Sequence, residues 1–254
     1  MPTSTTAPDD LGVAVEVTAP AQRVVSLVPS LTEAIAATRR DALVGATDWC
    51  THPEDLDVVR VRGTKNPDRA AISGLAPDLV VANQEENREL DVERLRAAGI
   101  AVWVTRIRTL DEAFDSIRRL FVDALGWDVP PWLTEAEQVW SEPPRRGGTR
   151  VAVPIWRDPW MVVGSDTFTG DLMARLGWHN VFDDSAERYP RVELAEIDRD
   201  DVDLVLLPDE PYIFSPDDGP EAFTHAPTAL VSGRSLTWYG PSLVSARAEL
   251  SRLA

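Results

Sequence analysis

Residues 24–33, VVSLVPSLTE, join a short apolar run directly to the start of a helix. Ser30 can cap a helix that begins at Leu31, with Glu33 reaching back as the second half of a capping box. Pro29 keeps the chain before the helix in an extended conformation. In open α/β sheets ligands bind beyond the carboxyl ends of the strands, where helices begin. The turn therefore predicts a ligand contact at Pro29 and Ser30, although a helix start alone also explains it.

The same strand-then-helix pattern continues through most of the chain. Short apolar runs rich in β-branched residues alternate with amphipathic segments, which is typical of parallel sheets with crossover helices. The expected strands are residues 13–17, 23–27, 42–47, 78–82, 101–104, 150–154, 204–207 and 229–231. Residues 75–87 and 199–211 share the order acidic turn, buried strand and acidic loop. This internal similarity predicts two related lobes.

The middle of the chain differs from both sides. Residues 109–125 place apolar side chains at helical spacing, and a proline-rich stretch follows them. We therefore expect an α/β protein with two Rossmann-like lobes, each with a central, mostly parallel sheet, joined by a helical linker and with a ligand cleft between the lobes. The expected boundaries are 1–108 for the N-terminal lobe, 109–147 for the linker and 148–254 for the C-terminal lobe.

Composition and charge exclude several classes of partner. The 254 residues include 25 Lys and Arg against 42 Asp and Glu, a net charge of −17 that repels nucleic acid and anionic membrane surfaces. The single cysteine excludes an internal disulfide and a zinc site built on several thiolates. No apolar run reaches the roughly 18 residues of a membrane span.

The first residues show no export signal. The first basic side chain is that of Arg23, and no apolar run of about 7–15 residues precedes it. As written, the sequence predicts a cytoplasmic protein; a truncated start would instead be compatible with a periplasmic or extracellular one.

Catalytic motifs are missing from the sequence, so we expect a protein that is not an enzyme and requires no cofactor. One polar cluster, residues 47–53 (TDWCTHP), still needs an explanation. If this segment is extended, Asp48, Cys50 and His52 share one face and are weak candidates for a metal site. Two readings stay open: a loop that lines a pocket, including His52, and a metal-dependent enzyme that uses these three side chains.

Aromatic residues give a more consistent pattern. Several of the nine tryptophans fall in expected loops after strands, where rings can form an apolar wall for a bulky small molecule. The candidate ligand-binding aromatics are Trp49, Trp156, Trp160, Tyr189, Trp238 and Tyr239. Trp103 and Trp178 are better explained as packing residues. Lys65 and Arg106 could each bind a carboxylate or phosphate on a ligand, or pair with surface acids.

Five segments together resemble a known family. RVVSLVPSLTEAIAAT, LVGATDWCTHP, GTKNPDRAAISGLAPDLVVANQEEN, LRAAGIAVWVT and GDLMARLGWHNVFDD are similar to the helical-backbone, class III substrate-binding proteins of ABC importers, of the cobalamin- and iron-siderophore-binding type. The resemblance covers residues 12–254 in order. It implies a non-enzymatic protein that binds a bulky metal chelate, with a corrinoid first and a ferric siderophore or haem next.

The resemblance also implies roles for single residues. Trp49 lies where relatives place an aromatic ring against the corrin, and Tyr189 matches a second pocket aromatic. Asn83 stands where relatives have a pocket tryptophan. Glu89 and Glu210 match acidic residues that dock on an ABC permease. The alternative is a cytoplasmic corrinoid or metal carrier, or a sensor, that has the same fold and works with a protein partner.

Overall fold

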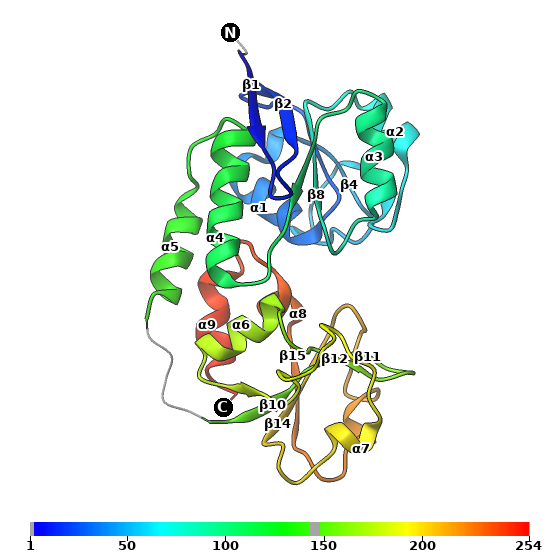
Figure 1. Cartoon of the computed structure of the whole chain (residues 1–254), viewed down its shortest axis with the longest axis vertical. Helices are drawn as coiled ribbons and strands as arrows, with labels where there is room; N and C mark the ends of the chain where they lie inside the picture. The colour runs from blue at the N-terminus through cyan, green and yellow to red at the C-terminus, as the bar shows by residue number, and fades with distance from the viewer. Residues whose placement is uncertain (1–2, 143–147, 254) are drawn as a thin grey trace. The chain divides into compact units, whose positions relative to one another are not determined.

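The computed structural model describes residues 3–142 and 148–253, and Figure 1 shows the course of the chain. Two compact units are present. Unit 1 comprises Met1–Ile107, Glu112–Glu135 and Tyr239–Pro241, and unit 2 comprises Arg108–Asp111, Ala136–Trp238 and Ser242–Ala254. The predicted boundaries at 108 and 147 stay a prediction, and residues 143–147, the end of the predicted linker, lie outside the described residues.

Unit 1 is built on a five-stranded parallel sheet. The strand order is β5 (Val59–Arg60), β4 (Leu43–Ala46), β3 (Val24–Ser26), β8 (Leu79–Asn83) and β9 (Val102–Thr105). Its helices include α1 (Pro29–Arg39), the short η1 (Arg40–Ala42), α2 (Arg69–Gly74) and α3 (Glu89–Ala97). Side chains with exposures near zero, among them Val25, Val80 and Ile72, form the core between sheet and helices. Four predicted strands are thereby confirmed.

The strand predicted at 13–17 is present, but it does not join the parallel sheet. β2 (Ala14–Ala19) instead pairs antiparallel with β1 (Thr3–Pro8), a strand that the sequence did not predict. The connection between them spans only residues 9–13, with Gly12 at a φ of +78°. A parallel crossover needs about a dozen residues or more, so this short turn permits only a hairpin.

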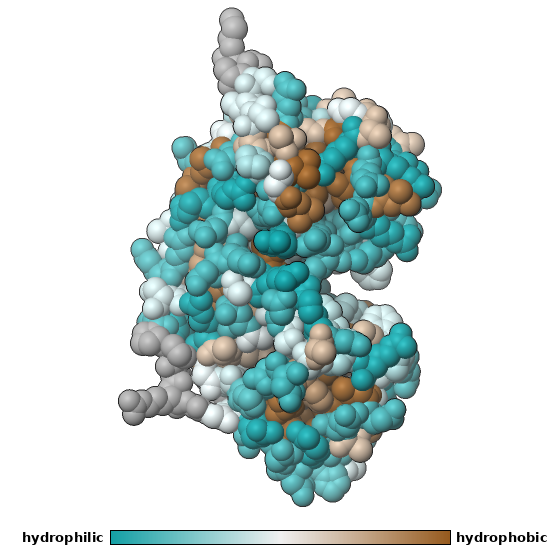
Figure 2. Space-filling model, viewed as in Figure 1, coloured by the Kyte–Doolittle hydropathy of each residue, from teal (hydrophilic) through white to brown (hydrophobic). Residues whose placement is uncertain are grey.

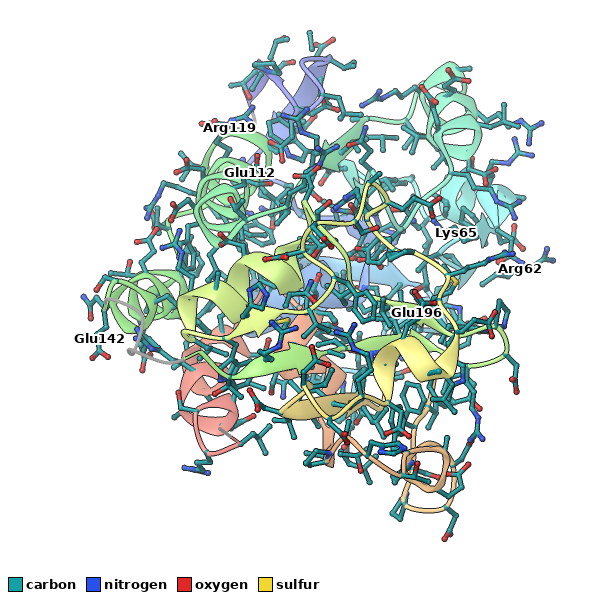
Figure 3. All side chains as sticks on the ribbon, turned by 60° about the horizontal axis from the view of Figure 1, so that its bottom comes forward. Arg62, Lys65, Glu112, Arg119, Glu142 and Glu196 are labelled. Carbon is teal, nitrogen blue, oxygen red and sulfur yellow. The ribbon has the colours of Figure 1, made fainter. Side chains whose placement is uncertain are left out.

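Two consecutive aspartates anchor the tip of this hairpin. The Asp9 carboxylate is fully buried and lies 2.6 Å from the guanidinium of Arg96. Asp10 accepts from Arg119 at 2.7 Å and from the hydroxyl of Ser116 at 2.5 Å. Figure 3 shows Arg119 on its helix beside the hairpin. These contacts hold an otherwise two-stranded ribbon on the body of unit 1.

Unit 2 contains a four-stranded parallel sheet in the order β13 (His179–Asn180), β10 (Arg150–Ala152), β14 (Leu204–Pro208) and β15 (Thr228–Val231). A separate hairpin consists of β11 (Pro154–Trp156) and β12 (Met161–Val162). The helices of this part of the chain are α6 (Phe168–Arg175), α7 (Leu194–Ile197), η3 (Pro220–Ala222), α8 (Gly233–Thr237) and α9 (Leu243–Leu250). The strands predicted at 150–154, 204–207 and 229–231 are confirmed, whereas β13 and the hairpin were missed.

The internal similarity seen in the sequence has a structural counterpart. β8 lies between β3 and β9, and β14 lies between β10 and β15. In front of β8 the carboxylate of Asp78 accepts from the backbone N–H of Arg23 at 2.9 Å. In front of β14, Asp203 accepts from the backbone N–H of Arg150 at 2.7 Å. An aspartate at the equivalent position therefore connects the two corresponding strands in each unit.

Helices connect the two sheets along the chain, as predicted. α4 (Leu110–Arg119) continues into one π-helical turn, η2 (Leu120–Ala124), and α5 (Pro131–Trp140) follows after a short loop. The ring of Phe121 packs against Trp127 and Trp132, with ring centroids 5.8 and 6.0 Å apart. A further segment, β6 (Arg62–Gly63) and β7 (Asn66–Pro67), forms a small hairpin in unit 1.

The surface agrees with the strongly acidic composition. Figure 2 shows a face on which hydrophilic residues predominate and hydrophobic residues form small patches. Within the described ranges, none of the helices combines the length and the apolar character that a membrane crossing requires.

Asp198 in unit 2 gives the fold a testable dependence on pH. Burial opposes ionisation of this carboxyl, but hydrogen bonds from Ala226, Thr224 and His225 outweigh that effect and lower its pKa to about 2. The pKa in the unfolded chain is about 3.9. Asp198 therefore stabilises the folded state above about pH 4, and this contribution is lost as the pH falls towards 2.

We expect Asp198→Asn to lower the free energy of unfolding at pH 7 by about 1–2 kcal/mol, because hydrogen bonds to a charged acceptor are replaced by weaker ones. The loss should shrink between about pH 4 and pH 2. Urea denaturation across this range measures it, with the highly exposed Asp200 as the matched Asn control. A pH-independent loss in Asp198→Asn would contradict the prediction.

Candidate functional site

The first turn of α1 lies just beyond the carboxyl end of β3. Val28 is the N-cap residue, and Pro29 occupies the first turn of the helix. The predicted capping box of Ser30 and Glu33 is therefore wrong, because proline, with its fixed φ and missing N–H, is well suited to the first helical position. Ser30 is buried, and its hydroxyl has no hydrogen-bond partner among the described residues. Pro29 and Ser30 do lie at the expected edge of the sheet.

The loop after β4 is a turn and not the extended segment that the metal hypothesis required. Cys50 points inward, where its Sγ lies 2.9 Å from Thr32 Oγ1 and 3.1 Å from Thr47 Oγ1. Asp48 is exposed, and His52 is only partly buried. The three side chains do not share a face, so this part of the prediction is wrong. The described residues also contain no group of three His, Cys, Asp or Glu side chains suited to a metal ion.

Burial also makes Cys50 a poor metal ligand. Desolvation raises the pKa of its thiol, and the hydrogen bonds from Thr32 and Thr47 only partly offset this effect. A thiol with a raised pKa stays protonated at neutral pH, whereas metal binding needs the thiolate. Cys50 is therefore best described as a packing residue that holds the loop against α1.

Trp49 is the most exposed aromatic residue of unit 1. Its exposed fraction is 64%, although the next residue, Cys50, is buried. A Cβ atom added to Gly63 would lie 3.2 Å from the indole Nε1. The indole therefore lies against the β6–β7 hairpin at a residue without a side chain, and it presents the rest of its surface to solvent. An exposed ring held in this way is suited to stacking on a flat ligand.

Lys65, the only lysine of the chain, lies on the same hairpin. Its ammonium donates to the carbonyl oxygen of Glu85, which follows β8. Partial burial lowers its pKa, Glu86 opposes this shift, and Arg88 adds to it. Figure 3 labels Lys65 and Arg62 on this hairpin. Lys65 therefore brings a cation to the loops that also carry Trp49.

Asn83 is buried at the end of β8, and its side chain serves the turn. Its Nδ2 donates to Thr105 Oγ1 at 3.1 Å, and its Oδ1 accepts from the backbone N–H of Glu85 at 2.8 Å. Such an arrangement shapes the loop and leaves little of the amide for a ligand. The role that we predicted for Asn83 as a direct ligand contact is therefore replaced by a structural one.

In unit 2, Trp156 and Trp160 belong to one aromatic cluster. Trp160 stacks on Phe214 with ring centroids 6.0 Å apart and packs into the core. Trp156 is 44% exposed and lies edge-on to Tyr212 at 5.6 Å. Of the two, only Trp156 therefore offers much ring surface at the end of its strand.

The sequence-based prediction missed two neighbouring residues at this cluster, of which one is strongly exposed. Tyr212 is partly buried, and Ile213 is 71% exposed, in the loop that follows β14. The hydroxyl of Tyr212 donates to Asp218 at 2.7 Å, and this hydrogen bond raises the pKa of Tyr212. The run Tyr-Ile-Phe, a few residues after a predicted strand, was the available signal. It is apolar where a loop is expected to be polar.

Tyr189 lies at a surface depression in unit 2. The depression has a volume of about 570 Å³ and is lined by Met161, Ser185, Ala186, Glu187, Tyr189, Pro190 and Arg191. The guanidinium of Arg188 lies 5.6 Å from the ring centroid of Tyr189. Gly164 packs directly under this loop, because an added Cβ would lie 2.9 Å from Pro190 and 3.1 Å from the carbonyl oxygen of Arg188. Tyr189 is therefore available at the surface, as predicted.

Trp238 and Tyr239 are buried, with exposed fractions of 5% and 7%. The prediction that they form an exposed ligand wall is therefore wrong. Tyr239 is part of unit 1, where its hydroxyl lies 3.2 Å from the carboxylate of Glu86. Trp103 and Trp178 are buried, as expected for packing residues.

The predicted docking acids differ in their surroundings. Glu89 is exposed at the first position of α3. Glu210 is partly buried against Gly233, whose added Cβ would lie 3.0 Å from the Glu210 carbonyl oxygen and still closer to its side chain. Arg106 is exposed, and its backbone N–H donates to Asp10 at 2.9 Å. Glu89 is therefore exposed at the surface, whereas Glu210 is partly packed within unit 2.

The chain is similar to known proteins in sequence and in fold. No family model matches the sequence. Over 185 residues the chain is 25% identical to the vitamin B12-binding protein of Vibrio cholerae serotype O1, which covers 70% of this chain and 67% of the relative. It is 27% identical over 188 residues to the vitamin B12-binding protein of Salmonella typhimurium, covering 70% and 68%.

Solved structures show the same fold. The periplasmic vitamin B12-binding protein BtuF of Vibrio cholerae matches with a TM-score of 0.70 and 19% identity, over 92% of this chain and 96% of that one. The periplasmic haem-binding protein RhuT from Roseiflexus matches with a TM-score of 0.71 and 20% identity, over 91% and 97%. At these identities the likeness establishes the fold.

In sequence and in fold the chain is similar to one class of protein, the α/β substrate-binding proteins built from two lobes. The similarity in sequence to vitamin B12-binding proteins supports the resemblance to the helical-backbone, class III substrate-binding proteins of ABC importers, and the solved structures share the fold. These relatives and neighbours are described as binding proteins, in keeping with the prediction of a protein that is not an enzyme.

Proposed function

We propose that this protein binds a bulky metal chelate, with a corrinoid as the preferred ligand and haem or a ferric siderophore next. One observation carries the proposal: an exposed indole, that of Trp49, is held over Gly63 at the carboxyl end of the sheet in unit 1. A conjugated macrocycle offers a flat, partly apolar face that stacks well on such a ring. The vitamin B12-binding relatives favour a corrinoid among these ligands.

Polar groups around Trp49 suit a ligand with polar or anionic edges. Lys65 supplies a cation on the hairpin beneath the indole, and Pro29 and Ser30 lie at the start of α1. In binding sites, a few polar groups at the rim of an apolar surface fix the orientation of the ligand. In unit 2 the ring of Trp156 is exposed, and Tyr189 lines a surface depression. That one ligand lies between the lobes stays a prediction.

We further propose that the protein delivers its ligand to an ABC permease, outside the cytoplasmic membrane. Support comes from the periplasmic location stated for BtuF and RhuT and from the exposed Glu89. A carboxylate on a surface helix can pair with a basic patch on a partner, which mainly directs association. None of the proteins compared above is described as a cytoplasmic carrier or sensor, so that alternative lacks support.

Titration of the purified protein with cyanocobalamin, haemin and a ferric siderophore tests the proposal. We expect at least one saturable interaction with a Kd tighter than about 1 μM, a free energy of roughly −8 kcal/mol. Cyanocobalamin should bind most tightly. Tighter binding of haemin would contradict the corrinoid preference alone, whereas the lack of saturable binding in all three titrations would reject the proposed function.

A further inference from the structure

Asn87 connects three loops at the carboxyl end of the sheet in unit 1. It is buried, and it follows β8 by four residues. Its Nδ2 donates to the carbonyl oxygen of Leu27 at 3.2 Å and to that of Thr64 at 3.0 Å. Its Oδ1 accepts from the backbone N–H of Asn83 at 2.8 Å. One amide therefore uses both its donors and its acceptor on three separate segments.

Each of these segments carries part of the proposed ligand site. Leu27 directly precedes the N-cap of α1 and hence Pro29. Thr64 lies in the hairpin between Gly63, which supports the indole of Trp49, and Lys65. Backbone carbonyl groups that are buried or partly buried need a hydrogen-bond donor. Here one side chain supplies a donor to two of the segments at once, and so it sets the distance between them.

A second contact closes the same arrangement. Lys65, on the hairpin, donates to the carbonyl oxygen of Glu85, which lies between Asn83 and Asn87 in the chain. The hairpin is therefore attached to the loop after β8 at two points. Without Asn87 this hydrogen bond from the lysine side chain would remain, but a flexible side chain of this kind fixes a position poorly.

We propose that Asn87 is a positioning residue. It fixes the β6–β7 hairpin, which carries Lys65 and supports Trp49, relative to the start of α1, and it thereby sets where both side chains contact the ligand. The ligand part of this inference rests on the proposed function; the positioning part does not. Asn87 itself touches no ligand in this proposal, because all its polar atoms are engaged within the protein.

Asn87→Ala tests the proposal, with Asn180→Ala in unit 2 as the matched control. Asn180 is equally buried, donates to the carbonyl oxygens of Val163 and Gly164 at 3.0 and 3.2 Å, and accepts from the N–H of Phe182. The two variants should lose similar stability. Only Asn87→Ala should change the surroundings of the single lysine, which can be followed without any ligand.

The first measurement is the pH dependence of acetylation of Lys65, followed by peptide mass spectrometry at a temperature where both variants are folded. Burial lowers the pKa of Lys65, with Glu86 and Arg88 as its charged neighbours. We expect the midpoint in Asn87→Ala to rise by about 0.5 pH units or more, because the released ammonium becomes better hydrated. Asn180→Ala should match the unmodified protein. An unchanged midpoint in Asn87→Ala would overturn the proposal.

The second measurement is the Kd for whichever of cyanocobalamin, haemin or the siderophore binds best. We expect Asn87→Ala to weaken binding at least about threefold. The maximal signal should be retained, because the contact surface is displaced and not removed. A shifted Lys65 midpoint with an unchanged Kd would overturn the ligand part. If none of the three binds, the proposed function fails, and the Lys65 measurement still decides the positioning role. Asn87→Ser serves if Asn87→Ala does not fold.

Discussion

Asp9→Ala is expected to lower the free energy of unfolding by about 3–5 kcal/mol, the usual cost of leaving one partner of a buried ion pair without its counter-charge. The Asp9 carboxylate is completely buried and lies 2.6 Å from Arg96. It also accepts from the backbone N–H groups of Leu11 and Val13 at 3.0 and 2.9 Å. Its removal would leave these donors without a partner in the turn between β1 and β2.

The same substitution should also loosen an edge of the main sheet. Asp9 accepts from the backbone N–H of Val104, and Asp10 donates to the carbonyl oxygen of Val104. β9 is an edge strand, and an edge strand with free backbone groups is a site for association with other chains. We therefore expect Asp9→Ala to aggregate more readily on heating than the unmodified protein does.

Urea denaturation and light scattering measure both effects. The matched control is Asp55→Ala, which breaks an exposed ion pair with Arg40 at 2.9 Å. Exposed pairs contribute little to stability, so this control should unfold like the unmodified protein. Equal behaviour of the two variants would show that the hairpin tip does not depend on the buried carboxylate.

Trp49→Ala should weaken ligand binding by about 1–3 kcal/mol, roughly 5- to 150-fold in Kd. A ring that stacks on a macrocycle stabilises the complex through its contact surface, and this contact is lost when the ring is removed. The folded protein without ligand should lose little, because 64% of the side chain is exposed and surface substitutions change stability by only about 0.5 kcal/mol. The expected signature is therefore a large change in Kd with nearly unchanged thermal unfolding.

Isothermal titration with the best ligand measures the Kd of Trp49→Ala. Leu90→Ala is the control, since Leu90 is a large apolar residue with a similar exposed fraction, 52%, on α3. Loss of affinity in both variants would point to a general effect of surface substitution. An unchanged Kd in Trp49→Ala would remove the indole from the site, and with it the main support for stacking.

Much of the fold was predictable because it depends on local patterns. The buried strands β3, β4, β8 and β9 are short runs of apolar residues. The acids in front of β8 and β14 make equivalent hydrogen bonds in the two units. The ribbon of β1 and β2 was misplaced for an equally local reason. Its sequence predicts a strand, but the short turn at Gly12 decides that the partner is the preceding segment.

The candidate site was predictable only in part. Trp49 and Tyr189 were expected at the surface and lie there, whereas Trp238 and Tyr239 occupy an expected loop and are nevertheless buried. Loop position alone does not separate these cases, because burial depends on what packs against the loop. The metal hypothesis failed similarly, since it assumed an extended segment where the chain turns and buries Cys50.

The buried strands of the two sheets, the acidic surface and the repeat of one strand–acid arrangement are properties of the amino-acid sequence itself, because they arise from periodicity and composition over a few residues. Tertiary structure alone decided which ring is exposed and what holds it. Gly63 makes room for Trp49, and Asn87 ties that hairpin to the start of α1. Such contacts join residues far apart in the chain, and no local pattern records them.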